Sequence, residues 1–387
     1  MSAEVVKNEN KDKKTKGKRK KWIAGIVGIL ALAGLGIGGY FYLQGKDVRT
    51  GVLGISEKQG VPEGVTVDPD TDLVTNGGAV LKYADLEHLD ENAESVVYYT
   101  ADITPQALVK VYEALGFEAT GKVGVKLSTG EPPASNYLDP VLVKDLVRKL
   151  NATIVENNTA YGGSRTTTAM HRQVAKEHGF TAIADVDIMD EEGSMSIPVV
   201  GGRRLKEDLV GSHFANYDTY VVLSHFKGHV MAGFGGAIKN ISIGFGSAKG
   251  KVLIHTAGER DSGSIGHNDQ DAFVESMAEA GKAVSDYMGN GERIVYVNVM
   301  NRLSIDCDCD GHPAAPDIHD IGIVASTDPV ALDQACIDMV FISEGNKTFV
   351  NRVEKKHGLV ILEHGEEIGL GHRNYRIVNL DEEASGN

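Results

Sequence analysis

Short apolar runs alternate with longer amphipathic stretches from about residue 95 onward. The runs VVYYT, VGVKLS, TIVEN, TAIADV, YVVLS, RIVYVNVM and IGIVAS are rich in β-branched and aromatic residues, which is typical of strands. Between them, stretches such as TPQALVKVYEALG, DPVLVKDLVRKL and DPVALDQACIDMVF repeat apolar residues at the spacing of a helix. This β-α-β alternation predicts an α/β fold with a mostly parallel, doubly wound sheet in a two-lobed body.

A different pattern covers residues 22–43, where a run of 22 residues, WIAGIVGILALAGLGIGGYFYL, contains no charge. The run is long enough to cross a bilayer as a helix, and aromatic residues mark both of its ends. Lysine and arginine dominate residues 1–21, which predicts a basic cytoplasmic tail and an extracytoplasmic main domain. We therefore expect a single-pass transmembrane signal anchor at 22–43. A cleaved signal peptide is the alternative, but no A-x-A-like cleavage site follows the run.

Composition and charge divide the rest of the chain. Residues 44–94 are rich in Gly, Pro and Asp and lack periodicity, so we expect a juxtamembrane linker or arm before an α/β domain at 95–387. The whole chain has a formal net charge of −15; residues 1–21 carry nine Lys/Arg against three acidic residues, net +6, which leaves −21 for the remainder. Such an acidic body argues against nucleic-acid binding. The expected partners are the membrane, through the N-terminal helix, and a small-molecule substrate.

The segment from His225 to His255 is the densest in candidate chemistry, with three histidines, four lysines and seven glycines. Histidine carries protons or binds metal near neutral pH. Lys239 is flanked by small and apolar residues that would desolvate its amine and make it nucleophilic. Glycine allows the backbone to approach a bound group closely, which makes candidate cofactor-binding positions of Gly233, Gly235 and Gly236. A glycine-rich connection with solvated lysines is the alternative.

Polar side chains follow several predicted strands at the point where each strand ends. Glu131 follows VGVKLS, Glu156 and Asn157 follow TIV, and Asp306 follows RIVYVNVM. Ligands of doubly wound sheets bind at the carboxyl ends of the strands, so these loops are expected to converge. Ordinary loops also contain polar residues.

Cys307 and Cys309 lie in an acidic stretch, DCDCDGH, that ends at His312. Thiolates together with imidazoles suit zinc or iron. The third cysteine of the chain, Cys336, lies in a predicted helix as a small core residue, so one chain cannot complete a four-cysteine zinc site or an all-cysteine iron–sulfur cluster. Two interpretations remain: a metal site that His312, His319 or a distant histidine completes, and an acidic turn whose thiols merely pack.

Several separated motifs together resemble the family of the domain of unknown function 362: LSTGE at 127–131, HFKGHVMAGFGGAIKNISIG, the CDC stretch and IGIVASTDPVALDQA. The resemblance covers about residues 95–345. Many members of that family carry a ferredoxin-like module with C-x-x-C-x-x-C motifs and are described as iron–sulfur proteins. Here His255 leads into TAGERDSGSIGH without such cysteines, so the resemblance does not imply a ferredoxin role.

A shorter motif, H-x-x-A-G-F-x-G-x-x-K at 229–239, resembles one of the nickel-pincer lactate racemase family. In that family the lysine tethers a nickel-bearing pyridinium cofactor, the preceding histidine is an acid/base, and a later histidine ligates nickel. The resemblance implies these roles for Lys239, His229 and His255. The family's other acid/base histidine lies in a T-G-x-H-like loop, where this chain has Glu131, so the second base is missing or is replaced by a carboxylate.

Three functions are compatible with these observations. The first is a membrane-anchored enzyme, an isomerase or oxidoreductase on a small hydroxy or carboxylated substrate, with catalytic His229, Lys239 and Glu131. The second is a metal-binding or iron–sulfur-related redox protein centred on Cys307 and Cys309. The third is a non-catalytic surface binding module. The candidate metals are nickel, zinc and iron, and the candidate ligands are His255, Cys307, Cys309 and His312.

Overall fold

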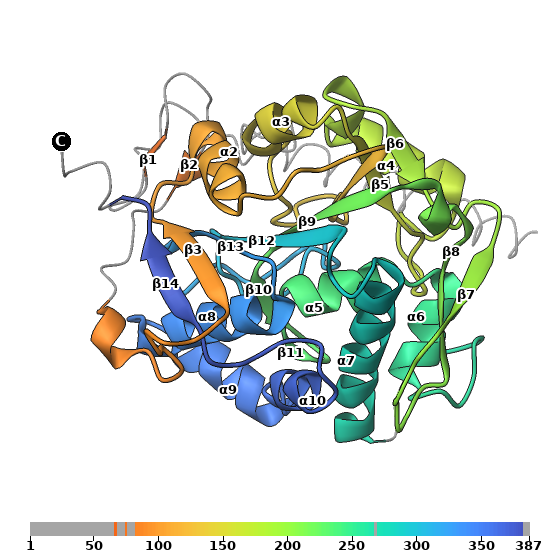
Figure 1. Cartoon of the computed structure of the whole chain (residues 1–387). Coiled ribbons are helices and arrows are strands. Elements are labelled where there is room, and N and C mark those ends of the chain that lie inside the picture. Colours follow the sequence, from red (N-terminus) through yellow and green to blue (C-terminus); the bar gives the residue numbers. More distant parts are fainter. Residues whose placement is uncertain (1–65, 68–73, 76–81, 267–268, 382–387) are drawn as a thin grey trace, which may run out of the picture. The chain divides into compact units, whose positions relative to one another are not determined.

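Eight strands form one central sheet in the computed structural model of the chain, which describes residues 66–67, 74–75, 82–266 and 269–381 (Figure 1). The order across the sheet is β14-β3-β13-β12-β9-β4-β5-β6. In that order the strands are Arg376–Asn379, Val96–Thr100, Gly322–Ser326, Ile294–Met300, Thr219–His225, Val123–Lys126, Thr153–Glu156 and Val186–Ile188.

All neighbouring strands of this sheet are parallel except at β13, which is antiparallel to both β3 and β12. The mostly parallel sheet predicted from the sequence is therefore confirmed. The exception arises because no helix connects β12 to β13: loop 301–321 turns the chain straight back, and a parallel neighbour would need a crossover. This return places loop 301–321 at the carboxyl end of β12.

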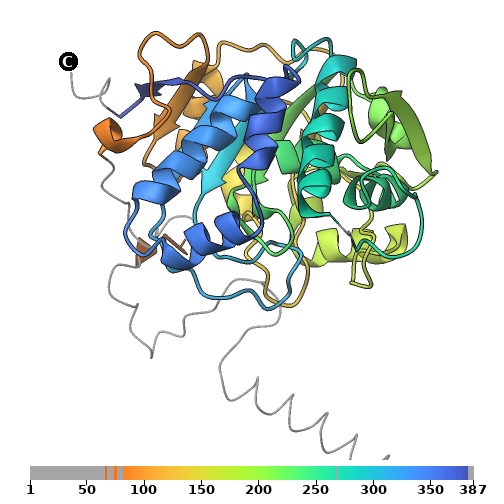
Figure 2. The same cartoon turned by 90° about the horizontal axis from the view of Figure 1, so that it is seen from below.

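Helices cover both faces of the sheet, as a doubly wound fold requires (Figure 1). Strand β9 shows why: Tyr220 and Val222 point into one apolar cluster, and Val221 and Leu223 point into the other. Figure 2 looks onto one face, where blue helices and the teal α7 lie in front of the strands. One face is covered by α2 (Pro105–Ala114), α3 (Pro140–Lys149) and α4 (Thr168–Glu177), and the other by α5 (Ala237–Lys239), α6 (Ala248–His255), α7 (Gln270–Tyr287), α8 (Pro329–Ile342), α9 (Lys347–Lys355) and α10 (Val360–Glu367).

Local sequence explains where several helices begin. Pro105, Pro140 and Pro329 occupy the first helical turn, where the missing N–H of proline costs no hydrogen bond. The residue before each proline, a threonine or an aspartate, accepts a hydrogen bond from a backbone N–H of that turn. The apolar stretch TAIADV, residues 181–186, is different: its first two residues belong to a 3-10 turn at Phe180–Ala182, and strand β6 begins only at Val186.

Within the described residues, three two-stranded sheets accompany the central one. They pair β1 (Thr66–Val67) with β2 (Val74–Thr75), β7 (Ser194–Pro198) with β8 (Glu207–Gly211), and β10 (Lys227–His229) with β11 (Gly233–Gly235). Some residues expected in the linker contact the body, since Leu86 is buried and the His88 backbone donates to Asp338 at 3.0 Å.

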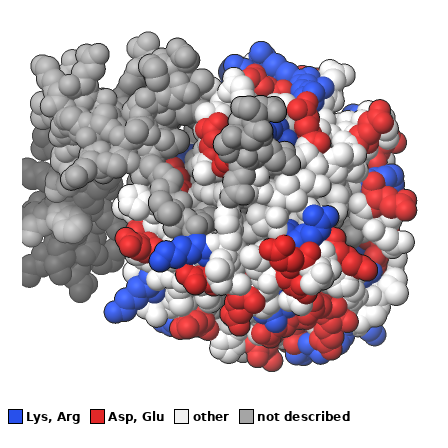
Figure 3. Space-filling view, turned by 60° about the vertical axis from the view of Figure 1, so that its left-hand side comes forward, with Lys and Arg blue, Asp and Glu red and all other residues white. Residues whose placement is uncertain are grey.

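The described residues belong to one unit, Val61–Asn387, so the predicted second lobe is not found among them. The predicted transmembrane helix at 22–43 lies outside the described residues, and within them no helix is both long and apolar enough to cross a membrane. Figure 3 shows one face of the molecule, where acidic and basic side chains are interspersed and acidic groups gather along the lower part.

Candidate functional site

A cavity of about 380 Å³ lies at the carboxyl ends of β4, β5, β9 and β12. This edge of the sheet is where doubly wound folds bind their ligands. Segment 225–255 forms one wall, and loop 301–321 forms another. The side chains of interest that line the cavity are Lys126, Glu156, Arg165, Lys227, His229, Lys239, Lys251, His255, Cys307, Asp308 and Cys309.

Segment 225–255 reaches the cavity through a series of short elements. Strand β9 ends at His225, the β10/β11 hairpin follows, and the three-residue α5 continues into a π-helix, Asn240–Gly244. Helix α6 then begins at Ala248 and is capped by Ser247, whose hydroxyl accepts the Gly250 N–H. π-Helical turns are rare and occur frequently at functional sites, which agrees with the lining role of Lys239 and Asn240.

The three glycines expected to bind a cofactor have packing roles in this segment. A Cβ at Gly236 would lie 2.2 Å from Asp333 Oδ1, and one at Gly235 would lie 2.8 Å from Lys239 Cδ. Gly233 has a φ of +86°, a left-handed conformation that favours glycine. Gly235 and Gly236 do line the cavity, but the space that they leave is filled by Asp333 and by the Lys239 stem.

Asp333 of α8 holds α5 in place. Its carboxylate accepts the backbone N–H groups of Ala237 at 2.7 Å and Ile238 at 2.9 Å, and it also accepts the Asn298 amide at 2.7 Å. The side chain is fully buried. A carboxylate at the first N–H groups of α5 satisfies donors that have no partner within the helix. Asp333 therefore positions the helix that carries Lys239 into the cavity.

Lys239 is the most unusual base of the site. Its ammonium forms no hydrogen bond or ion pair with any residue of the described ranges, and the side chain faces the cavity. Burial, and next the charge of Lys227, lowers the pKa of Lys239 to about 7. A large share of this amine is thus neutral, and nucleophilic, near neutral pH.

His229 and His255 line the same cavity in defined tautomers. The Ala232 N–H donates to Nδ1 of His229 at 3.0 Å, which places the proton of the neutral ring on Nε2. Burial and the charge of Lys239 hold the pKa of His229 well below its usual value. His255 donates from Nδ1 to the Lys251 carbonyl at 2.6 Å and stacks on Phe273, with 4.8 Å between ring centroids. Its neutral ring therefore has the lone pair on Nε2.

Glu131 does not line the cavity. Its carboxylate pairs with Arg165 Nε at 3.3 Å and accepts the Tyr161 hydroxyl at 3.4 Å. The carboxylate that does line the cavity is Glu156, which contacts Lys126 Nζ at 3.3 Å and Arg165 Nη1 at 3.1 Å. Burial alone would raise the pKa of Glu156, but Lys126 and the neighbouring His171 and Arg165 hold it well below its usual value.

A buried ion pair ties loop 301–321 to β10. Asp308 accepts from Lys227 Nζ at 2.6 Å and lies 2.8 Å from Nδ1 of His225, whose Nε2 is 2.6 Å from the Asn301 carbonyl. Burial would raise the pKa of Asp308, but the charges of Lys227 and His225 lower it far below the usual range. The loop that carries both cysteines is thus held by charge as well as by packing.

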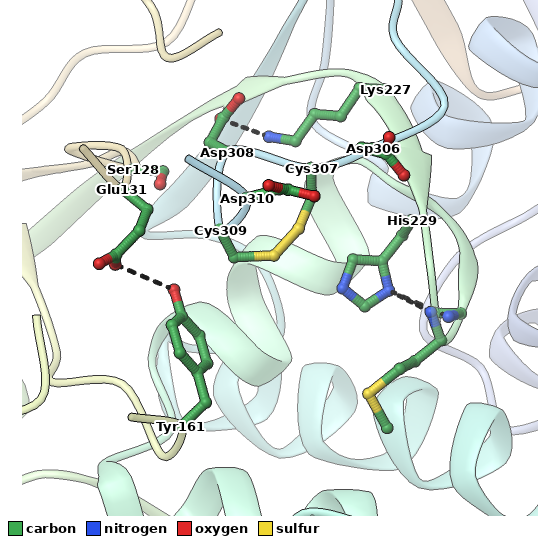
Figure 4. The surroundings of a disulfide bond; sticks show 12 residues. Ser128, Glu131, Tyr161, Lys227, His229, Asp306, Cys307, Asp308, Cys309 and Asp310 are labelled. Carbon is green, nitrogen blue, oxygen red and sulfur yellow. Dashed lines mark hydrogen bonds and ion pairs between the residues drawn. A yellow bond between two sulfur atoms is a disulfide. The ribbon is translucent and has the colours of Figure 1, made fainter. Parts of the chain in front are cut away.

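Cys307 and Cys309 form a disulfide that faces the cavity beside His229 (Figure 4). The His229 ring and the two sulfurs offer ligand atoms that all lie within 4.8 Å of one another, a group that could hold a metal. His255 lines the cavity but is not in this group, and His312 is exposed and does not line the cavity. Cys336 is fully buried, as expected for a core residue.

Lys126 and Lys251 were not among the predicted site residues, and Glu156 was expected near the site only as a polar residue after a strand, without a role. Lys126 ends β4 and Glu156 ends β5, so their position after an apolar run was a signal for both. Lys251 gave no such signal, because it lies within α6 and enters the cavity only through the packing of that helix.

The fold and the site define an α/β protein with a lysine-rich cavity at the carboxyl ends of its central strands. The sequence profile described as "Domain of unknown function (DUF362)" matches residues 123–338, and the chain belongs to this family. The match spans β4 to α8 and contains both walls of the cavity. No curated protein matches the chain.

Two solved structures resemble the chain distantly. The lactate racemase apoprotein from Thermoanaerobacterium thermosaccharolyticum is 16% identical, with a TM-score of 0.32, over 54% of this chain and 51% of that one. A protein from Thermotoga maritima is 13% identical, with a TM-score of 0.33, over 68% of this chain and 58% of that one. The chain thus spans about half the length of the first, and neither likeness bears on the function.

Proposed function

We propose that the protein is a membrane-anchored enzyme, an isomerase or oxidoreductase, that acts on a small hydroxy or carboxylated molecule in the cavity. The observation that carries this proposal is Lys239, a cavity-lining amine with no carboxylate partner among the described residues and a pKa lowered to about 7. Groups with strongly shifted pKa values in a cavity are typical of active sites. Lys239 is the residue that would hold a cofactor or substrate covalently.

The histidines have separate tasks in this proposal. Because Ala232 donates to Nδ1 of His229, the neutral ring presents an Nε2–H that can stabilise negative charge on a substrate oxygen. This refines the acid/base role expected for His229, since the ring cannot accept a proton on Nδ1 without losing the Ala232 hydrogen bond. Glu156 is held ionised by its cationic neighbours, so it serves to orient Lys126 and Arg165.

The residues present fit the nickel-bearing cofactor that the motif resemblance implies. Lys239 offers the amine that would carry the group, and the Nε2 lone pair of His255 has the chemistry of a nickel ligand. Such a group, when bound, supplies an electrophile that accepts hydride from a 2-hydroxy acid. The chain's own contribution is to hold the group, to exclude water and to place the Nε2–H of His229 in the cavity.

Intact mass and elemental analysis of the full-length chain, purified from its own host without chelator, test the proposal. We expect a mass increment on the peptide that contains Lys239, with stoichiometric metal, and loss of both in Lys239→Ala. Lys249→Ala is the matched control, because Lys249 lies in the same segment with a side chain 64% exposed. Three results together would overturn the proposal: Lys239 is unmodified, the protein holds no metal, and borohydride reduction does not fix any substrate to the Lys239 amine.

A second candidate, a metal or redox centre, is favoured by the grouping of His229 with Cys307 and Cys309. A dithiol reductant would convert the disulfide to two thiols and become oxidised to a disulfide itself, after which two thiolates can bind zinc, iron or nickel. The test is to add Co²⁺ to the protein before and after reduction and to monitor binding through the cobalt–thiolate absorption bands. Cys309→Ser should abolish the bands and Cys336→Ser should leave them; identical spectra for reduced and oxidised protein would exclude this centre.

The membrane anchor at 22–43, with residues 1–21 in the cytoplasm, is also part of the proposal. It is supported by the uncharged run and the basic residues before it. Protease added to intact cells should digest the body while the N-terminal tail stays protected. Digestion of the body only after lysis would contradict this topology.

A further inference from the structure

The bases that line the cavity outnumber the buried carboxylates that contact them. The lining bases are Lys126, Arg165, Lys227, Lys239 and Lys251, and the buried carboxylates are Glu131, Glu156 and Asp308. Five bases minus three carboxylates leave two bases without a carboxylate at ion-pair distance when every base is protonated. The charge of Lys251 also acts on Asp208, a buried carboxyl of β8, but burial raises the pKa of Asp208 to about 7, so it offsets that charge only in part at neutral pH. Asp306 and Asp310 lie at the rim, where the first is partly exposed and the second is exposed.

The existing pairs show which bases are in excess. Lys227 forms an ion pair with Asp308, which also contacts His225. Arg165 forms ion pairs with Glu131 and Glu156, and Lys126 pairs with the same Glu156. The two bases without such a partner are Lys239 and Lys251.

Lys251 and Lys239 lack a carboxylate at hydrogen-bond distance. Lys251 Nζ donates to the Gly246 carbonyl at 2.5 Å, and Lys239 has no hydrogen-bond partner in the described part of the chain. Asp190 is an acid whose charge acts on Lys251, but its carboxylate accepts the backbone N–H groups of Asn158 and Ala248. The two ammonium groups therefore face the cavity with unused donors.

Burial makes this arrangement costly for a protein without a ligand. It lowers the pKa of Lys239 to about 7 and that of Lys251 to about 8, and it lowers the pKa of Lys126 as well. Desolvated lysines regain their charge when an anion binds beside them. A cavity built with three such lysines is therefore matched to an anionic ligand, and His229 adds the Nε2–H as a further donor.

We infer that the ligand of this cavity is a small dianion, a phosphate monoester or a dicarboxylate, bound between the ammonium groups of Lys126, Lys239 and Lys251. Two uncompensated charges match two negative charges better than the single charge of a simple carboxylate. This inference deepens the proposed function, and it rests on that proposal only in taking the cavity as the place where the substrate binds. A cavity of about 380 Å³ restricts the ligand to a small molecule.

Calorimetric titration of the full-length protein at neutral pH with inorganic phosphate, glycerol phosphate, succinate and acetate tests the inference. We expect succinate or the two phosphates to bind at least roughly tenfold more tightly than acetate. Preference between succinate and the phosphates tells the dicarboxylate from the phosphate monoester. Binding should also take up protons, because the anion raises the pKa of Lys239 and Lys251, and heats in two buffers of different ionisation enthalpy measure that uptake. Equal affinity for acetate and the dianions, or no binding of any anion, overturns the inference.

Two variants separate this result from a general loss of folding. Lys251→Met should weaken dianion binding by roughly tenfold or more, while Lys249→Met, on the same helix but exposed, should leave it unchanged. Lys239→Met should remove much of the proton uptake. If dianions bind but Lys239 carries no modification, no metal is present and borohydride traps no substrate on Lys239, the enzyme proposal fails and this inference stands. If Lys239 is modified but acetate binds as well as succinate, the reverse holds.

Discussion

The two walls of the cavity are built in different ways. The first wall, segment 225–255, consists of short regular elements that are anchored by fully buried side chains such as Ala237, Ile238 and Ile241. The second wall, loop 301–321, has no helix or named strand and is held through Asp308 and by backbone hydrogen bonds from Glu131 and Ala134. The first wall supplies the unusual lysine, and the second supplies the disulfide.

This difference predicts different sensitivities. A wall held by apolar packing responds to changes in volume, whereas one held by a buried ion pair responds to the loss of a charge. Substitutions that are equally conservative in size should therefore have unequal effects on the two walls.

The largest expected effect is chemical and belongs to the first wall. At about pH 7 roughly half of Lys239 is neutral, whereas an exposed lysine with a pKa of about 10.4 is neutral in roughly one molecule in a few thousand. A lower pKa also makes the amine itself less nucleophilic, so we expect Lys239 to react with a small amine reagent roughly tenfold or more faster than an exposed lysine such as Lys249 at this pH. Mass spectrometry of labelled peptides across a pH series measures the ratio. Half-maximal labelling of Lys239 above about pH 9 would show that burial does not act on it.

The second effect concerns the ion pair of the second wall. Asp308→Ala leaves Lys227 buried without a partner, so we expect a loss of about 3–5 kcal/mol in the free energy of unfolding. Because the folded pKa of Asp308 is lowered, this contribution is complete above the unfolded pKa of about 3.9 and is lost as the pH falls below it. Urea denaturation at several pH values measures it. The exposed Asp310→Ala is the control, and an equal loss in both variants would refute the role of the pair.

The third effect tests packing in the first wall. Gly236→Ala would place a Cβ 2.2 Å from Asp333 Oδ1, so we expect a loss of about 1–3 kcal/mol and a displaced α5. Gly162→Ala is matched to it, since nothing lies within 4 Å of the added Cβ and the backbone there is not left-handed. Thermal unfolding of both variants gives the comparison. Similar midpoints would mean that Asp333 can move aside without cost.

The smallest expected effect is that of the disulfide. Cys307 and Cys309 are separated by two positions, so the bond closes a very short loop and constrains the unfolded chain little. Cys309→Ser should therefore cost on the order of 1 kcal/mol, clearly less than Asp308→Ala. Urea denaturation of both variants under the same conditions decides this. A larger loss for Cys309→Ser would make the disulfide the main anchor of loop 301–321.

The fold was largely predictable because most strands of the sheet are apolar runs bounded by turns or helices. The direction of β13 was not, since it depends on how loop 301–321 returns. TAIADV was predicted as a strand because it is a short apolar run. Its Ile183 and Ala184 do pack against the core, but from a turn that precedes β6, and a sequence pattern does not distinguish the two.

The site was predictable in part. His229, Lys239, His255, Cys307 and Cys309 do line one cavity, as the glycine-rich segment and the cysteine pair suggested. Glu131 was predicted as catalytic because it stands where the racemase family has its second acid/base histidine, but its carboxylate pairs with Arg165 and does not line the cavity. His312 lies three residues beyond Cys309, and the chain there turns outward to solvent.

By itself, the sequence determined the alternation of strands and helices, the family, and which reactive residue types gather at the carboxyl edge of the sheet. These follow from local periodicity and from short motifs. Only the tertiary structure decided which charges are compensated: Lys227 finds Asp308 at a separation of 81 residues, and Lys126 finds Glu156 at 30, while Lys239 finds no carboxylate in the described chain. The physical reason is that the pKa of a buried lysine depends on the charged partners and the solvent within a few ångströms of its amine. Those surroundings are set by the packing of segments that are distant in the sequence.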